Sequence, residues 1–499
     1  MKKIFKISTL FVAALAGLSS CDLHKTPEGA IDPDNAMESL KDAIALRDGL
    51  YIAYRGSVTG SLVHQPEIQS DLMHATLAFG NNGGDFYEWT FQSANGTTTG
   101  WWGSMYNNSA QCNFFIQKAN LVDKSNWRAS AADSLQQFKG EAFFMRAYYH
   151  SFLLEKFCLP YPGNETSYGV PYVTSYNPTS DQTLYPSRGT QEEAYTKLIA
   201  DLDSAESYIK LAPKKGSIRL TTDAVKALRA RVALTMGDYA TAISNAKALI
   251  DGKKYPLCTS ADALKNMFLQ DSGEECIVML DADYATNSLP ASNSFYYMQY
   301  NSQTGTYNPY YVPEKWVVEG LYTKDDLRFP IFFLKTDVDL MGGSSFNLYI
   351  VNKFSGNDAF KSGDGPSEIN KAKPFRIAEQ YLILAEAYAK SGNSSEAVKY
   401  LNELQNNRGG SLALTTASID DILKERVREL FGEGFRISDL KRNGKDMKRG
   451  DAQIANSIYL PSTYQQFSKT SGDHRFLWPI PKDEIDANPN LKGQQNEGF

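Results

Sequence analysis

The sequence is poor in the residues from which metal sites and nucleophilic sites are usually built. Its 499 residues include only five His and five Cys. The histidines lie far apart, and no H-E-x-x-H pair occurs, which argues against a zinc hydrolase. No G-x-S-x-G and no G-x-x-x-x-G-K-[ST] occurs either. We therefore predict no catalytic residue, no metal ligand and no cofactor.

Basic residues are also fewer than acidic ones. The chain has 51 Lys and Arg against 57 Asp and Glu, a formal net charge of −6. A surface that binds nucleic acid needs a basic excess, so the balance argues against a nucleic-acid partner.

Long apolar runs are missing except at the start of the chain. Lys2, Lys3 and Lys6 precede an apolar run over residues 7–18, which is too short to cross a bilayer and is typical of a signal peptide. The run ends in Leu18-Ser19-Ser20-Cys21, which resembles a bacterial lipobox. We predict that residues 1–20 are removed and that Cys21 carries the lipid anchor. The alternative is an ordinary secretory signal with an incidental Cys.

The remaining cysteines show no C-x-x-C spacing; they are Cys112, Cys158, Cys258 and Cys276. In an exported chain they could form two disulfides, in any of three pairings. A chain of this length does not need disulfides to stabilise its core, so we expect buried thiols instead.

Helical periodicity runs through much of the sequence. Apolar residues recur at helical spacing over 138–152, and helix–turn–helix patterns occur over 223–250 and 375–404, broken at Gly237 and Gly392. With an offset of 155 residues, Ala230 aligns with Ala385 and Gly237 with Gly392. Small residues between antiparallel helices and Gly at the turn are typical of tetratricopeptide-like hairpins. We therefore predict a mostly α-helical scaffold of such hairpins, with long irregular loops.

Two stretches lack this periodicity and are rich in aromatic residues. The first aromatic segment, 79–106, holds eight aromatic residues, and the second aromatic segment, 284–311, holds seven Tyr. Long loops in a compact protein are usually functional or disordered, and aromatic density argues against disorder.

Several motifs in order resemble one family, the SusD/RagB-like outer-membrane nutrient-binding lipoproteins. The resemblance rests on the lipobox, on G-E-A-F-F-M-R-A-Y-Y at 140–149, on R-I-A-E-Q-Y-L-I-L-A-E-A at 376–387, on E-R-V-R-E-L-F-G-E-G-F-R at 425–436 and on L-W-P-I-P at 477–481. It implies one SusD-like domain over 21–499, with an N-terminal part over 21–255 and a C-terminal part over 256–499.

The same resemblance implies a function. Members are lipid-anchored in the outer membrane, face the cell exterior and form a lid on a SusC-like TonB-dependent β-barrel. They capture oligosaccharide or polysaccharide for import and have no catalytic activity. RagB-like members handle peptides, and this alternative stays open, as does the less favoured one of a lipid-anchored glycoside hydrolase.

A flat aromatic ring can cover the C–H face of a sugar, while neighbouring amides and hydroxyls bind the sugar's hydroxyl groups. We expect both aromatic segments to contribute rings to one ligand site. The candidate ligand-binding residues are Tyr87, Trp89, Trp101, Tyr296, Tyr297, Tyr300, Tyr307 and Tyr310. The charged residues Glu425, Arg426, Arg428 and Glu429 have the spacing of ion pairs along a helix, so we interpret them as structural.

Overall fold

The computed structural model describes residues 35–282, 289–340, 343–410, 413–459 and 467–499. The predicted signal peptide and the lipid-bearing Cys21 lie outside these ranges. Of the helices in the described ranges, none is both long and apolar enough to cross a bilayer.

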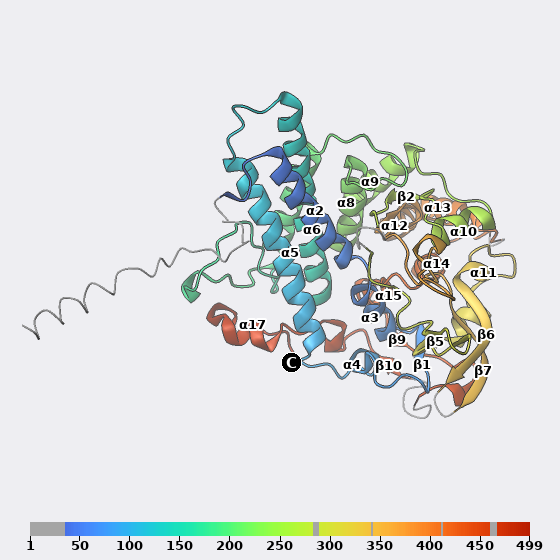
Figure 1. The fold of residues 1–499 in the computed structure, drawn as a ribbon. Helices are drawn as coiled ribbons and strands as arrows, with labels where there is room; N and C mark the ends of the chain where they lie inside the picture. Colours follow the sequence, from blue (N-terminus) through green and yellow to red (C-terminus); the bar gives the residue numbers. More distant parts are fainter. Residues whose placement is uncertain (1–34, 283–288, 341–342, 411–412, 460–466) are drawn as a thin grey trace, which may run out of the picture.

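The N-terminal part is mainly helical. Its helices are α2 (Leu40–Ser57), α3 (Ser61–Gln69), α4 (Gly84–Tyr87), α5 (Gly96–Leu121), α6 (Ala129–Phe157) and α7 (Gln191–Tyr208). Helices α2, α5 and α6 lie side by side, and α7 packs on α6 (Figure 1). The starts of α2 and α7 are fixed by capping boxes, Ser39 with Asp42 and Thr190 with Glu193, which satisfy backbone N–H groups that the helices leave free.

The two predicted helical hairpins are confirmed. The first joins α8 (Thr222–Met236) to α9 (Tyr239–Asp251), and the second joins α12 (Ile377–Lys390) to α13 (Ser394–Asn407). Gly237 and Gly392 have φ of 75° and 80°, a left-handed conformation in which a side chain would be strained. Helix α12 also packs against α9, so the hairpins stack on each other although they lie far apart in sequence.

Further helices and the β-strands complete the fold. The helices are α10 (Ala261–Leu269), α11 (Phe329–Phe332), α14 (Ile419–Leu430), α15 (Arg436–Arg442) and α17 (Lys482–Ala487). The strands are β1 (Met73–Ala75), β2 (Cys276–Val278), β3 (Tyr300–Asn301), β4 (Thr306–Tyr307), β5 (Tyr311–Pro313), β6 (Phe333–Leu340), β7 (Ser344–Val351), β8 (Phe375–Arg376), β9 (Met447–Lys448) and β10 (Ser468–Lys469). Ser418 and Asp421 form a capping box at the start of α14.

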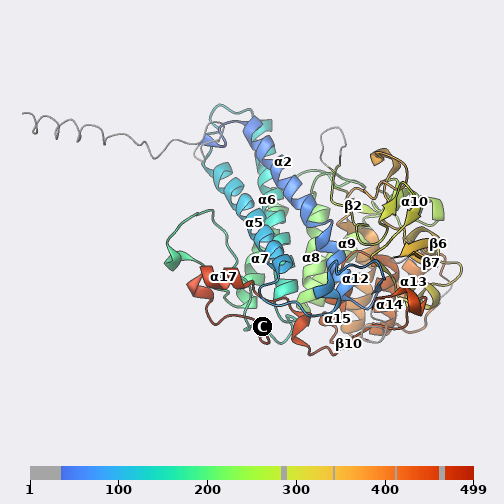
Figure 2. The same ribbon diagram turned by 60° about the horizontal axis from the view of Figure 1, so that its bottom comes forward.

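Strands of distant segments pair at the side of the molecule away from α5 (Figures 1 and 2). The order of the largest sheet is β3-β4-β6-β7, and β1 pairs antiparallel with β5, Met73 opposite Pro313. None of these strands was predicted from the sequence, which indicated irregular loops between the helices. The pairing of β1 with β5 matters most, because it joins the ends of the two aromatic segments.

The C-terminal tail returns to the N-terminal helices. Trp478 is buried, and its backbone N–H donates to the Lys156 carbonyl at 2.9 Å. The centroid of its ring lies 4.5 Å from that of the Trp101 ring. Arg188 is also buried and donates to the Gln494 carbonyl and the Asn496 side chain, both at 2.8 Å. The tail therefore closes the core around α5 and α6.

One sequence expectation needs correction here. The first aromatic segment is not irregular throughout, because α4 forms one turn within it and α5 begins at Gly96. Asn95 caps α5 by accepting from two backbone N–H groups, a start signal that the aromatic density obscured. The four cysteines in the described ranges are buried and free, as expected.

Candidate functional site

The two aromatic segments meet around Tyr311. The Tyr311 hydroxyl donates to the Asn82 carbonyl at 2.7 Å. Its ring lies 5.6 Å from Phe79 and 5.5 Å from Tyr87, both in the first segment. Gly83 has φ of 73°, and a Cβ there would lie 2.5 Å from Ile68 and 3.3 Å from the Tyr296 ring. Only glycine allows the segments to approach so closely.

Above this contact lies a group of rings that we call the aromatic face: Phe295, Tyr296 and Tyr310. Phe295 is 50% exposed, and Tyr310 is half-buried. The ring centroids are 5.4 Å apart for Phe295 and Tyr296 and 6.2 Å apart for Tyr296 and Tyr310. Gln65 donates to the Tyr296 hydroxyl at 3.0 Å, which fixes that ring at the inner edge of the face.

Tyr300 and Tyr307 form a second pair, opposite each other on β3 and β4. Their centroids are 5.1 Å apart, and both are half-buried. The Tyr300 ring rests on Gly365, where a Cβ would come within 2.2 Å of it. This pair thus stands on the β3–β4 hairpin, and both residues are partly exposed.

The expectation of exposed rings is wrong for five of the predicted residues. The buried ones are Tyr87, Trp89, Trp101, Tyr296 and Tyr297, which include all three candidates of the first aromatic segment. The Trp89 indole N–H donates to the Gln69 carbonyl at 2.8 Å, and its ring packs edge-on against Phe476. Trp101 donates to Ser61 at 3.1 Å and lies against Trp478. Because protein atoms already cover their flat faces, these rings belong to the core beneath the loops.

Buried polar groups support the aromatic face from below. His74 lies 3.3 Å from the Tyr87 hydroxyl and 3.2 Å from Glu314, all fully buried. Burial raises the pKa of Glu314, opposed by its hydrogen bond to His74. Arg449 donates to the Tyr87 carbonyl at 2.7 Å and to carbonyls at the end of α3. These contacts hold both segments in place.

Backbone strain is concentrated in the same region. Non-glycine residues with positive φ include Asn81 and Trp89 in the first segment and Gln299 in the second, at 62°, 56° and 46°. Such conformations cost about 1–3 kcal/mol each and persist only where the surroundings impose them, often at ligand sites.

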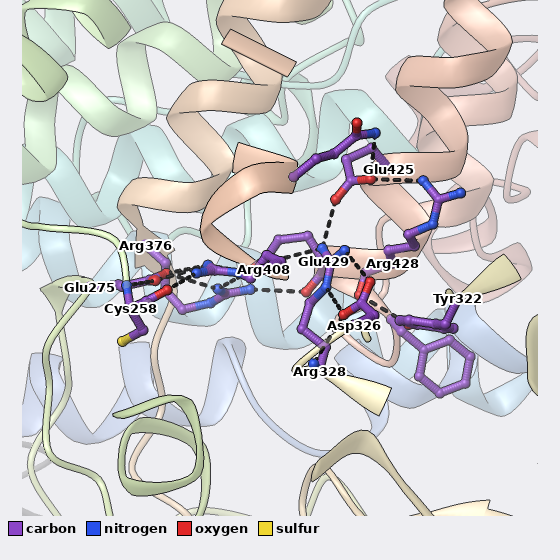
Figure 3. Close-up of polar contacts among 12 residues, drawn as sticks. Cys258, Glu275, Tyr322, Asp326, Arg328, Arg376, Arg408, Glu425, Arg428 and Glu429 are labelled. Carbon is purple, nitrogen blue, oxygen red and sulfur yellow. Dashed lines mark hydrogen bonds and ion pairs between the residues drawn. The ribbon is translucent and has the colours of Figure 1, made fainter. Parts of the chain in front are cut away.

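The charged residues of α14 form a separate, buried network (Figure 3). Glu429 accepts from Arg376 at 2.6 Å and from Arg408 at 2.9 Å, and Glu425 accepts from Arg328 at 2.7 Å. Burial alone would raise the pKa of Glu429, but the guanidinium groups of Arg408, Arg376 and Arg328 outweigh it and hold that pKa well below its usual range. The structural interpretation of Glu425, Arg426, Arg428 and Glu429 is confirmed, because each is buried and ion-paired.

Sequence reasoning missed two residues of the site. Phe295 directly precedes the predicted Tyr296, but the second aromatic segment is defined by its Tyr content, which does not include Phe. Gln65 lies on α3, far from both aromatic segments in sequence, and no local pattern points to it. Across the described ranges, no group of three or more His, Cys, Asp or Glu side chains is arranged to hold a metal ion.

The fold and this face define a class: a scaffold of stacked helical hairpins that presents aromatic loops on one side. Residues 292–499 match the model of the SusD family, and residues 46–234 match a model described as "Starch-binding associating with outer membrane". The chain belongs to the SusD family.

Individual relatives agree with this assignment. A SusD-like protein of Formosa agariphila is 23% identical, over 89% of this chain and 93% of its own length. The starch-binding protein SusD of Bacteroides thetaiotaomicron is 32% identical over 133 residues, which are 25% of this chain and 21% of that protein. A crystal structure of a SusD superfamily protein from the same organism superposes with a TM-score of 0.76 at 26% identity, over 92% of this chain and 99% of that chain.

Proposed function

We propose that this protein is a cell-surface lipoprotein that binds oligosaccharide or polysaccharide and delivers it to a SusC-like TonB-dependent importer. The observation that carries the proposal is the aromatic face, where Phe295, Tyr296 and Tyr310 stand together at the junction of two strained loops. Rings 5–6 Å apart, with amides beside them, match the alternating C–H faces and hydroxyl groups of a sugar chain.

The comparisons support the same proposal. The model matched by residues 46–234 is described as starch-binding and associated with the outer membrane, and one relative is named for starch binding. Anchoring would come from a lipid on Cys21, and Tyr300 and Tyr307 would extend the site along the β3–β4 hairpin. Binding would proceed by stacking and hydrogen bonding, without cleavage of the glycan.

Isothermal titration of the protein from residue 22 onward against a panel of soluble polysaccharides tests this proposal. We expect one glycan class to bind, and chromatography after prolonged incubation to show no shortened products. Binding of peptides in place of every glycan would favour the peptide alternative. Hydrolysis that disappears on changing a single Asp or Glu would place the protein among the enzymes.

The anchor is tested separately. Cys21→Ala should release the protein from the membrane fraction on a high-salt wash, because the lipid would be its anchor in the bilayer. Cys112→Ala, which changes a buried thiol, is the matched control and should stay attached. A Cys21→Ala protein that still sediments with outer membranes after a high-salt wash would contradict the anchor.

A further inference from the structure

A cavity of about 140 Å³ lies between the N-terminal helices and the C-terminal part. Its walls come from α6 and α8, from residues 57–63 and from residues 370–376 and 433–435. It shares no residue with the aromatic face. One buried water needs about 10–15 Å³ on this scale, so the cavity has room for roughly ten waters or one small polar molecule.

Aromatic rings form much of the cavity wall. Phe152 projects from α6, Phe354 follows β7, and Phe435 precedes α15. Such rings offer flat apolar faces to a ligand, and pockets at the junction of two parts of a chain commonly hold small molecules.

The charges of the wall balance one another. Arg231 is bound by both oxygens of Glu379 at 2.7 Å, Lys371 pairs with Asp281 at 2.8 Å, and Lys373 pairs with Asp271 at 2.5 Å. Lys156 pairs with Glu155 at 2.8 Å, and Arg376 with Glu433 at 2.5 Å. A charged ligand would find no spare counter-charge here, and burying an unpaired charge is costly. The cavity therefore favours a neutral ligand.

The wall still has hydrogen-bonding capacity. Arg231 uses Nε and Nη2 for Glu379 and the Pro374 carbonyl, and within the described ranges its Nη1 has no partner. Glu155 and Glu433 each accept through Oε1, and their Oε2 atoms are likewise without a partner among the described residues. None of these three free atoms is fully shielded from solvent.

Both carboxylates serve as acceptors at neutral pH. Burial alone would raise the pKa of Glu155, but the Lys156 ammonium outweighs it and lowers that pKa to about 2. The guanidinium of Arg376 likewise outweighs burial and lowers the pKa of Glu433. A ligand with several hydroxyl groups can accept from Arg231 and donate to both carboxylates.

We propose that this cavity is a second saccharide subsite, which takes a single neutral sugar unit between the two parts of the chain. The inference rests on the proposed function, because it assumes that the protein meets sugars. It adds a site away from the aromatic face. The rings of Phe152, Phe354 and Phe435 would stack on the sugar's C–H face. The free atoms of Arg231, Glu155 and Glu433 would bind its hydroxyl groups.

The test fills the cavity without removing any of its ion pairs. Ser151 lines the cavity on α6, and its hydroxyl bonds only the Tyr148 carbonyl, so Ser151→Phe should occupy the space. Ser134, on the same helix, bonds its own turn in the same way and does not line the cavity, so Ser134→Phe is the matched control. Ala291→Trp fills the cavity from the opposite wall, should Ser151→Phe fail to fold.

The full-length protein in detergent is probed with glucose, galactose, mannose and xylose by saturation-transfer NMR. We expect at least one sugar to bind wild type, Ser134→Phe and the double variant Phe295→Ala/Tyr310→Ala alike. Binding to a folded cavity-filling variant should be at least tenfold weaker. Equal binding by that variant would overturn the inference, as would failure of all four sugars to bind wild type.

Oligosaccharide titrations of the same proteins separate this inference from the proposed function. If the double variant loses oligosaccharide binding while the cavity-filling variant binds every sugar normally, the proposed function stands and the second subsite is excluded. If no saccharide of any length binds wild type, both proposals are overturned.

Discussion

The helical hairpins and the aromatic segments are both visible in the sequence, yet only the hairpins could be oriented from it. In α8–α9 and α12–α13, Ala230, Ala385, Ala242 and Ala397 are all fully buried, as their helical spacing requires. In the aromatic segments the sequence does not show which side chains face the core. Tyr87 is fully buried, while Phe295 is half exposed.

A sequence pattern predicts the direction of side chains in a helix but not in a loop. In a helix, the 3.6-residue period fixes which side chains face a neighbour before the neighbour is known. In a loop, the direction of each ring is set by the tertiary contacts around it. Aromatic density therefore marks the two segments but does not show which rings cover the core and which face solvent.

The largest expected effect comes from the buried charges that join α14 to Arg328 and, through Arg376 and Arg408, to the two ends of the hairpin α12–α13. Glu429→Gln should lower the free energy of unfolding by about 3–5 kcal/mol, because it removes the buried carboxylate that Arg328, Arg376 and Arg408 share. Glu396→Gln, which breaks an exposed pair with Lys399, should cost less than about 1 kcal/mol. Urea denaturation measures both, and equal losses would contradict the central role of the network.

A second pair of variants compares covered with exposed rings. Trp89→Ala should cost about 3–5 kcal/mol of stability, as for other buried aromatics. Phe295→Ala should change stability by less than about 1 kcal/mol. It should weaken glycan binding by about ten- to a hundredfold, by analogy with rings that stack on bases. Normal binding by Phe295→Ala in titrations would remove the aromatic face from the site.

Acid should weaken the hairpin scaffold. Burial opposes ionisation of Glu386 on α12, but the Arg442 guanidinium outweighs it and lowers its pKa from 4.5 to about 2. Because the folded pKa lies below the unfolded one, this stabilisation is complete above pH 4.5 and is lost as the pH falls toward about 2. The melting temperature should therefore fall over that range. Glu386→Gln should be less stable at neutral pH and should show a shallower fall, and an unchanged slope would exclude Glu386 as a cause.

The smallest effects come from two glycines in open surroundings. Gly392 ends α12 with φ of 80°, so Gly392→Ala should cost about 1–2 kcal/mol. Gly103 lies within α5 without positive φ and with no atom near its missing Cβ, so Gly103→Ala should stabilise by about 0.4–1 kcal/mol. Thermal melts measure both, and shifts of the same sign would show that the hairpin turn is not under conformational constraint.

The local sequence is enough to predict the helical scaffold and the paired hairpins. Each depends on neighbours along the chain: a helical period, a capping residue three positions away, or Gly at the end of a helix. The same local information predicts a leader over 1–20 and a lipid on Cys21.

The arrangement of the candidate site depends on contacts between distant segments, which the tertiary structure shows. Gln65 on α3 reaches Tyr296 across 231 residues, and Tyr311 binds Asn82 across 229. The pairing of β1 with β5 sets the register between the two segments, and short strands of three residues carry too little periodicity to predict it. Which rings stay exposed is decided by these distant contacts, because each ring is covered by whatever segment the fold brings beside it.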